Sequence, residues 1–355
     1  MKIPFTDLQS QYAEAKSSID AAIAHTIATN SFITGPDVIK FETTLADYLG
    51  VPAAASTGSC TTALQVALKA CDVRPGDDVI TTSHTFVSTV EAIINVGAAP
   101  IMVDTDEYYQ LDADAVEEAI TPRTTAILAM DAYGQSCNIH KLREIADRNG
   151  LKLINDSAHS FGSALMNVAD LNCFSFNPIK NFGAMGDAGA VVGRADLIER
   201  CRMFRDHGRN TKFVFEEVGY NARIDNLQAN ILLAKLPYLK DWNEGRKRVA
   251  ARYDTALGNV VKIPKKSGYS DHVYYVYVIE VEERDNLAAY LKDCGIATNI
   301  HYPIPCHLQP AFRKYHDSLP NCERASKRIL SLPCYHTLTE QQQDYIIDKI
   351  WEWRV

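Results

Sequence analysis

The sequence lacks several features that would assign it to a common class of protein. Its nine cysteines include no C-x-x-C pair and their number is odd, so we predict neither a disulfide framework nor a zinc ribbon, and we expect no metal site. No apolar stretch approaches the roughly 20 residues that span a bilayer, and residues 1–7 contain no apolar signal region. We therefore expect a cytoplasmic protein with reduced thiols and no membrane partner.

The sequence also lacks an excess of positive charge and the common phosphate-binding motifs. A formal net charge of -8 argues against general affinity for nucleic acid, so small molecules are the expected partners. Neither G-x-x-x-x-G-K-[ST] nor G-x-G-x-x-G occurs, which counts against an NTPase or a dinucleotide enzyme. A serine hydrolase is not indicated either, because no G-x-S-x-G elbow is present.

What the sequence does contain is an alternation of short apolar strands with helices. Strands rich in β-branched residues are predicted at residues 78–81, 100–104, 126–128 and 151–154. Helical periodicity separates them at residues 63–70, 113–120 and 139–148. This alternation predicts an α/β fold in which helices cover both faces of a mostly parallel sheet, with ligands beyond the carboxyl ends of the strands.

The pattern changes after about residue 240. Residues 273–281 predict a strand and residues 285–293 a helix, and a loop rich in proline and histidine follows at residues 301–307. We predict a large domain over residues 1–240 and a smaller α+β domain over residues 241–355. We expect the loop at residues 301–307 to return to the ligand site.

Two charged residues follow predicted strands. Lys180 lies five positions after Ser175, before a glycine-rich turn, and Asp156 ends the strand that begins at residue 151. A lysine on a fixed, partly desolvated support can shed its charge near neutral pH and perform covalent carbonyl chemistry. A carboxylate at this edge can hold a pyridine nitrogen protonated, although an Asp that caps the next helix explains position 156 equally well.

A third feature is the predicted helix start at Ser59, Cys60 and Thr61. Free N–H groups, hydroxyls and the positive end of the helix dipole suit a phosphate there, whereas ordinary capping explains the same residues. Gly58 favours the phosphate, because glycine permits close approach of the backbone to an anion. Lysine, carboxylate and helix start together supply what pyridoxal phosphate needs.

These segments resemble the DegT/DnrJ/EryC1/StrS family of sugar aminotransferases over nearly the whole chain. The motifs that carry the resemblance are Thr-Phe-Val-Ser-Thr at 85–89, Tyr-Gly-Gln at 133–135, Asn-Asp-Ser-Ala-His at 155–159, Ser175 with Lys180, Gly-Tyr-Asn-Ala-Arg at 219–223 with Leu-Gln-Ala at 227–229, His-Tyr-Pro at 301–303 with His-Leu-Gln-Pro at 307–310, and Leu-Ser-Leu-Pro at 330–333 before Leu-Thr-Glu at 338–340. The resemblance implies the aspartate-aminotransferase fold, which is fold type I of the enzymes that use pyridoxal phosphate.

The resemblance implies a role for each matched residue around the cofactor ring. Lys180 would form the imine with pyridoxal phosphate and shuttle protons, and Asp156 would pair with the pyridinium nitrogen. Phe86 would stack on the ring, although an unlocated phenylalanine is more often plain core. His159 stands where the family usually has glutamine, and it is either a partner of the phenolic oxygen or a loop histidine.

The resemblance also implies how the phosphate and the substrate are held. The phosphate would lie among Ser59, Cys60, Thr61 and Ser175. Asn221 would reach the phosphate of the neighbouring subunit, which implies a twofold homodimer with shared active sites. The sugar nucleotide would face His301, Tyr302 and His307.

The activity implied by the resemblance is transfer of an amino group from an amino acid, L-glutamate, to a nucleotide-linked keto-deoxy sugar during amino-sugar biosynthesis. One alternative is a sugar dehydratase of the same fold that uses pyridoxamine phosphate, but such enzymes have histidine at the position of Lys180. Another is a regulator or scaffold that binds pyridoxal phosphate without turnover. No basic segment for DNA binding accompanies the chain to favour it.

Overall fold

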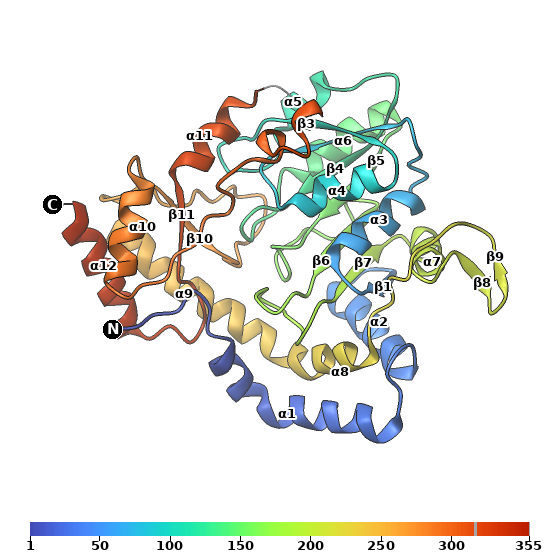
Figure 1. Cartoon of the computed structure of the whole chain (residues 1–355), viewed down its shortest axis with the longest axis horizontal. Helices are drawn as coiled ribbons and strands as arrows, with labels where there is room; N and C mark the ends of the chain where they lie inside the picture. The colour runs from blue at the N-terminus through green and yellow to red at the C-terminus, as the bar shows by residue number, and fades with distance from the viewer. Residues whose placement is uncertain (316–317, 355) are drawn as a thin grey trace.

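The computed structural model describes residues 1–315 and 318–354, and its centre is a seven-stranded sheet (Figure 1). The strands are β1 (Ala53–Thr57), β2 (Asp78–Thr82), β3 (Ala99–Val103), β4 (Thr124–Met130), β5 (Lys152–Asp156), β6 (Leu171–Ser175) and β7 (Gly189–Gly193). Their order is β1-β7-β6-β5-β4-β2-β3, and only β7 runs antiparallel to its neighbours. The predicted mostly parallel sheet is confirmed.

Eight helices of the large unit pack around this sheet. They are α1 (Leu8–Thr29), α2 (Pro36–Leu49), α3 (Cys60–Ala70), α4 (Val87–Asn95), α5 (Ala113–Glu118), α6 (Ile139–Asn149), α7 (Ala195–Phe204) and α8 (Asn226–Lys235). Because side chains alternate along a strand, Leu128 packs with α3, α4 and α7 on one face, whereas Ile127 packs with α5 and α6 on the other. Both faces of the sheet are therefore covered, as the alternating sequence predicts.

The remainder of the chain forms a smaller α+β unit at the far end of a long helix, α9 (Leu239–Leu257) (Figure 1). Its elements are β10 (Tyr277–Glu280), α10 (Arg284–Asp293), α11 (Pro320–Arg328), β11 (Ile329–Leu332) and α12 (Glu340–Arg354), with short 3-10 turns at η1 (Leu236–Tyr238), η2 (Cys306–Leu308) and η3 (Arg313–Tyr315). The strand predicted at residues 273–281 is shorter than expected, because residues 273–276 leave the ladder to pack on the large unit. None of the described helices is long and apolar enough to cross a bilayer.

The contacts between the two units bear on the predicted division at residue 240. Val90 and Met102 of the large unit form one buried cluster with Cys306, Phe312 and other residues of the segment that precedes α11. At the other end of the chain, Ile3 pairs with Ile296 and lies in the core of the small unit. The N-terminal segment and the segment that precedes α11 therefore each contact the unit on the other side of the proposed boundary. The division itself stays a prediction.

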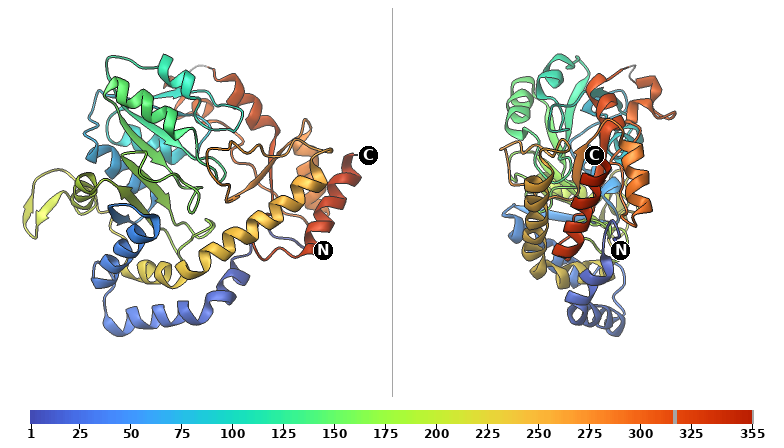
Figure 2. Two further views of the ribbon diagram at one scale, coloured as in Figure 1. Left: turned by 180° about the vertical axis from the view of Figure 1, so that it is seen from behind. Right: turned by 90° about the vertical axis from the view of Figure 1, so that its left-hand side faces the viewer.

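A hairpin projects from the sheet side of the molecule. It consists of β8 (Arg209–Thr211) and β9 (Val214–Phe215), and it extends well clear of the helices (Figure 2). Its apolar side chains face solvent in the single chain, with Phe213 80% and Phe215 59% exposed. Such an apolar projection is typical of a surface that another chain covers.

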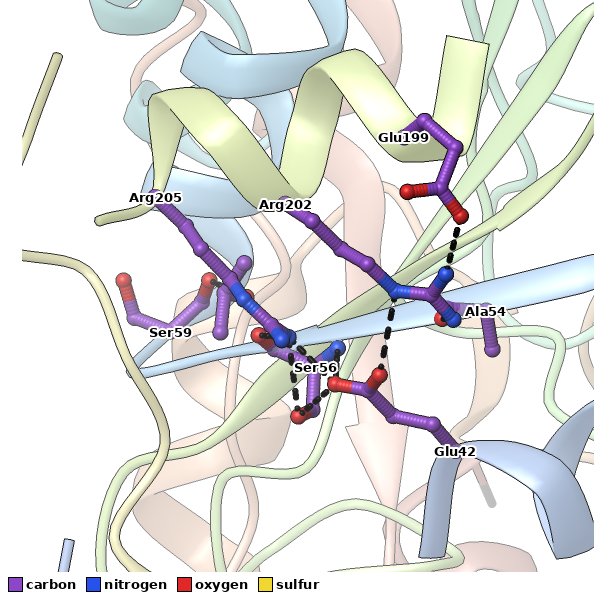
Figure 3. Close-up of polar contacts among 8 residues, drawn as sticks. Glu42, Ala54, Ser56, Ser59, Glu199, Arg202 and Arg205 are labelled. Carbon is purple, nitrogen blue, oxygen red and sulfur yellow. Dashed lines mark hydrogen bonds and ion pairs between the residues drawn. The ribbon is translucent and has the colours of Figure 1, made fainter. Parts of the chain in front are cut away.

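A buried carboxylate fixes the strand that leads into α3. Glu42 of α2 is 5% exposed, and its Oε1 accepts hydrogen bonds from the N–H (2.9 Å) and the hydroxyl (2.7 Å) of Ser56. Arg205 pairs with the same carboxylate and donates to the Ser56 carbonyl oxygen (2.6 Å). Arg202 adds contacts to Glu42 Oε2 (3.3 Å) and to the carbonyl oxygen of Ala54 (2.8 Å) (Figure 3). One buried charge thus joins α2, β1 and α7.

We expect Glu42→Gln to lower the free energy of unfolding by about 3 kcal/mol, because it leaves the largely buried Arg205 guanidinium without its counter-charge. Urea-induced unfolding monitored by circular dichroism measures this loss. Glu199→Gln is the matched control, since Glu199 pairs with Arg202 of the same network but is 70% exposed, and its loss should stay below about 1 kcal/mol. Equal losses in the two variants would contradict the role given to Glu42.

Candidate active site

A cavity of about 410 Å³ opens beyond the carboxyl ends of β5 and β6, beside the start of α3. Ten of the twelve residues that sequence reasoning selected line it: Ser59, Cys60, Thr61, Phe86, Asp156, His159, Ser175, Lys180, His301 and Tyr302. The sheet register explains part of this assembly, because Thr57 and Ser175 both pair with Gly189 of β7. The first eight of these residues therefore end strands of the sheet, or follow such strands in the chain, at one edge of the sheet. The last two come from the small unit.

The start of α3 presents hydrogen-bond donors to the cavity. Ser59 is the N-cap, and its Oγ accepts from the N–H of Thr62 (3.2 Å), so ordinary capping accounts for this side chain. The N–H groups of Cys60 and Thr61 precede the first intrahelical hydrogen bonds. Together with the positive end of the helix dipole and the nearby Ser175 hydroxyl, they form a set of donors that suits a phosphate.

Asp156 is the buried carboxyl group of the cavity. Its carboxylate accepts from Thr89 Oγ1 (2.8 Å, to Oδ2) and from the N–H of Ala158 (3.1 Å, to Oδ1). Burial raises the pKa of Asp156, whereas the hydrogen bonds from Thr89 and Ala158 and the charge of Lys180 act in the opposite direction. No helix follows β5 within the described residues 157–164, so the carboxylate stabilises a turn rather than a helix start.

The thiol of Cys60 also faces Asp156. Its Sγ lies 3.8 Å from Asp156 Oδ1, and burial together with this carboxylate raises the pKa of the Cys60 thiol well above its usual value. The thiol therefore keeps its proton and serves as a weak donor to the carboxylate. Cys60 thus contributes two groups to the cavity: its backbone N–H at the start of α3 and its thiol beside Asp156.

Lys180 also lines the cavity, half-buried, five residues beyond the end of β6. Its Nζ is 4.1 Å from the centre of the Tyr275 ring, which contacts it by a cation–π interaction. The same ring stacks on His159 at 4.3 Å with an interplanar angle of 28°. An aromatic platform from the small unit therefore holds the lysine beside the imidazole.

His159 is almost fully buried and electrically neutral. Burial, followed by the charge of Lys180 and the nearby His301 and His84, lowers its pKa well below the usual value. The backbone N–H of Tyr133 donates to Nδ1 (3.3 Å), so in the neutral ring the proton is on Nε2, which lies 3.4 Å from the hydroxyl of Tyr302. His159 therefore offers the cavity one N–H donor, as a glutamine amide would.

The mouth of the cavity is aromatic. Phe86 is the N-cap of α4 and its ring is 54% exposed, 5.9 Å from the ring of Tyr302. The loop that carries Tyr302 is fastened to the large unit, because the hydroxyl of Tyr133 donates to the carbonyl oxygen of His301 (2.5 Å). The His301 ring is held from the other side by Ser331 Oγ (2.8 Å). This mouth suits a flat ring lying against Phe86.

Two of the selected residues do not line the cavity. His307 is fully buried, with Nδ1 2.7 Å from Ser83 Oγ and Nε2 3.3 Å from Glu323 Oε1, and its side chain joins the two units. The expectation that His307 faces a substrate is therefore not met in the chain. Asn221 is exposed beyond the hairpin, where its Oδ1 accepts from Arg223 Nη2 (2.7 Å), and its predicted contact with a neighbouring subunit stays a prediction.

Tyr275 and Thr89 are among the residues of the site that sequence reasoning overlooked. Tyr275 stands in a run of valines and tyrosines that is typical of a strand, so nothing in the pattern singled it out. Thr89 closes the motif at residues 85–89 and lies three residues after Phe86, a spacing that places both in the first turn of α4, so the motif did carry a usable signal. Among the described residues, no group of three His, Cys, Asp or Glu side chains is placed to hold a metal ion.

The sequence profile of the DegT/DnrJ/EryC1/StrS aminotransferase family matches residues 13–351. The chain belongs to this family. The resemblance predicted from the motifs is thus confirmed, and with it the enzyme class of aminotransferase.

Three relatives are similar to this chain over most of their length. The dTDP-3-amino-3,4,6-trideoxy-alpha-D-glucose transaminase of Streptomyces venezuelae is 37% identical over 364 residues, which cover 99% of this chain and 96% of that enzyme. The pleiotropic regulatory protein of Geobacillus stearothermophilus is 39% identical over 366 residues, which cover 99% and 98%. The crystal structure of ntda from Bacillus subtilis with bound cofactor pmp matches with a TM-score of 0.93 at 33% identity, covering 99% and 85%. The predicted fold is confirmed.

The close approach of β7 to the start of α3 gives a test of the helix as an anion site. A Cβ added at Gly189 would lie 2.6 Å from the carbonyl carbon and oxygen of Ser59 and 2.7 Å from the nitrogen of Cys60. We expect Gly189→Ala to displace these N–H groups and to weaken the affinity for pyridoxal phosphate by about tenfold or more, measured by equilibrium dialysis. Gly258→Ala, at the end of α9, is the control and should bind as the parent does; unchanged affinity in Gly189→Ala would contradict the site.

Proposed function

We propose that this chain is a pyridoxal-phosphate-dependent aminotransferase that moves an amino group from an amino acid, L-glutamate, to a nucleotide-linked keto-deoxy sugar. The observation that carries the proposal is the pairing of Lys180 with the buried carboxylate of Asp156 across one cavity. The name of the Streptomyces venezuelae transaminase supports the class of acceptor, and the pmp-bound relative supports the cofactor. The cytoplasmic location expected from the sequence is part of this proposal.

The donor set of the cavity fits pyridoxal phosphate group by group. The phosphate would lie on the N–H groups at the start of α3 and the hydroxyl of Ser175, and the ring would lie against Phe86. The pyridine nitrogen would face Asp156, and the phenolic oxygen would accept from Nε2 of His159. When bound, this cofactor supplies an electron sink that stabilises a carbanion at the amino-bearing carbon of the substrate.

The side chains of this chain then divide the proton work. Asp156 would keep a proton on the ring nitrogen of the cofactor, because an ionised carboxylate in a buried site stabilises a cation next to it. Lys180 would accept the proton from the amino-bearing carbon at its Nζ and would return it on the other side of the transferred nitrogen. Tyr275 and His159, which are packed against each other, keep Nζ over the site and exclude water from its flank.

Two alternatives from the sequence are distinguished by Lys180. The dehydratases that resemble this chain have histidine at that position, so a lysine disfavours them. The name of the Geobacillus relative supports a regulatory role, but a regulator without turnover would have no need for a lysine and a carboxylate in catalytic apposition. Turnover with L-glutamate separates the enzyme from the regulator.

We expect the protein loaded with pyridoxal phosphate to absorb at roughly 410–430 nm and to bleach toward roughly 330 nm with L-glutamate. Borohydride reduction followed by peptide mapping should locate the label on Lys180.

Lys180→Ala should lose the band and the turnover while keeping its thermal stability, and Asp156→Asn should bind the cofactor but lose most of its rate. Lys314→Ala, an exposed lysine, is the control. A borohydride-fixed label on another residue, or on no residue, would contradict the proposal.

The proposed enzyme is a twofold homodimer with shared sites. The hairpin of β8 and β9 projects as an apolar arm, with Phe213 80% and Phe215 59% exposed, and Asn221 follows it in the chain. A surface of this kind supports burial against a second copy, since monomers rarely expose contiguous apolar patches. Asn221 would then reach the phosphate in the partner's cavity.

We expect Phe213→Asp combined with Phe215→Asp to dissociate the dimer, because it places two charges in an apolar interface, and sedimentation velocity measures the mass. Lys212→Glu on the same hairpin keeps the apolar side chains and should stay dimeric. Asn221→Ala should keep the dimer and weaken the affinity for pyridoxal phosphate by about tenfold. A parent protein that sediments as a monomer would contradict the shared site.

A further inference from the structure

Two buried threonines are linked by hydrogen bonds to Asp156, and of the two Thr85 lines the cavity whereas Thr89 does not. Thr89 is 0% exposed and its Oγ1 is 2.8 Å from Asp156 Oδ2. Thr85 is 3% exposed and its Oγ1 is 2.7 Å from Thr89 Oγ1. Both distances are those of well-formed O–H···O hydrogen bonds. The carboxylate is therefore linked to a short file of two hydroxyl groups.

The direction of these hydrogen bonds follows from the acceptor. The proposed pairing with a protonated ring nitrogen requires Asp156 to be ionised, and an ionised carboxylate can only accept, so the single proton of the Thr89 hydroxyl then points to Asp156. The contact between the two threonines then requires Thr85 to donate to Thr89. Consecutive hydrogen bonds of one direction polarise each other, so Thr85 strengthens the donor that Asp156 receives.

The position of Thr89 in the chain ties this carboxylate to the rest of the site. Thr89 belongs to the first turn of α4, whose N-cap is Phe86 at the cavity mouth. In the same turn, Ser88 Oγ accepts from Thr61 Oγ1 of α3 (2.8 Å). One helical turn thus contacts the expected ring, the expected phosphate site and Asp156.

We propose that Thr89, supported by Thr85, is a positioning residue that keeps Asp156 ionised and aimed at the ring nitrogen of the bound cofactor. This inference rests on the proposed function. Without the hydroxyl, the buried carboxylate loses its shortest donor, and the shared proton moves from the ring nitrogen to an oxygen of Asp156. The cofactor ring then becomes a neutral pyridine, which is a poorer electron sink.

The test compares Thr89→Val, which keeps the shape of threonine and removes the hydroxyl, with Thr89→Ser, which keeps the hydroxyl. Each protein is loaded with pyridoxal phosphate labelled with 15N in the ring, and 15N NMR reports whether the ring nitrogen carries a proton. In Thr89→Val we expect the resonance to move toward the unprotonated position and the half-reaction with L-glutamate to slow by roughly tenfold to a hundredfold in stopped-flow absorbance. Thr85→Val should shift both in the same direction by less.

Thr81→Val is the matched control, because Thr81 is equally buried and its hydroxyl donates to the Leu128 carbonyl oxygen instead (2.8 Å). It should leave the ring resonance in place while costing similar thermal stability. A ring resonance and rate in Thr89→Val equal to those of the parent would overturn the inference, as would Thr89→Ser behaving like Thr89→Val. A parent protein that binds no labelled cofactor at Lys180 would instead overturn the proposed function.

Discussion

Burial of the Asp156 carboxylate is the constraint around which the site is built. A charge removed from water is expensive unless donors and a counter-charge replace the solvent. Here a hydroxyl, a backbone N–H and a thiol surround it, and Lys180 faces it across the cavity. Asp156 is the last residue of β5, so the strand itself places the carboxylate at the carboxyl end of the sheet. The turns of neighbouring elements supply its hydrogen-bond partners.

Much of this fold could be predicted from the sequence because its strands are buried on both faces. A short, mostly apolar run such as residues 151–154 indicates a buried strand when helical periodicity precedes it, as at residues 139–148. The positions of Asp156 and Lys180 at the strand ends followed directly, since parallel strands direct their carboxyl ends to one edge. The order of the motifs along the chain is specific enough to indicate the family, which the family profile confirms.

The rest of the site depended on contacts between segments far apart in the chain, to which local pattern is blind. Tyr275 reads as a strand residue, yet it leaves the strand to support Lys180. His307 reads as a ligand in a loop rich in histidine, yet its ring is bound between Ser83 and Glu323. Cys60 was expected at a phosphate, and no spacing rule indicates that its thiol faces Asp156, 96 residues away.

The hydrogen bond from Tyr133 to the carbonyl oxygen of His301 means that substitutions in the outer wall of the cavity and substitutions in its inner wall have different consequences. It anchors the outer wall by a backbone atom, so this hydrogen bond does not depend on which side chains stand at positions 301 and 302. The inner wall consists of sheet-end residues whose replacement would disturb the buried charge. Substitutions on the outer wall can therefore change which substrate is bound while the residues around Asp156 stay the same.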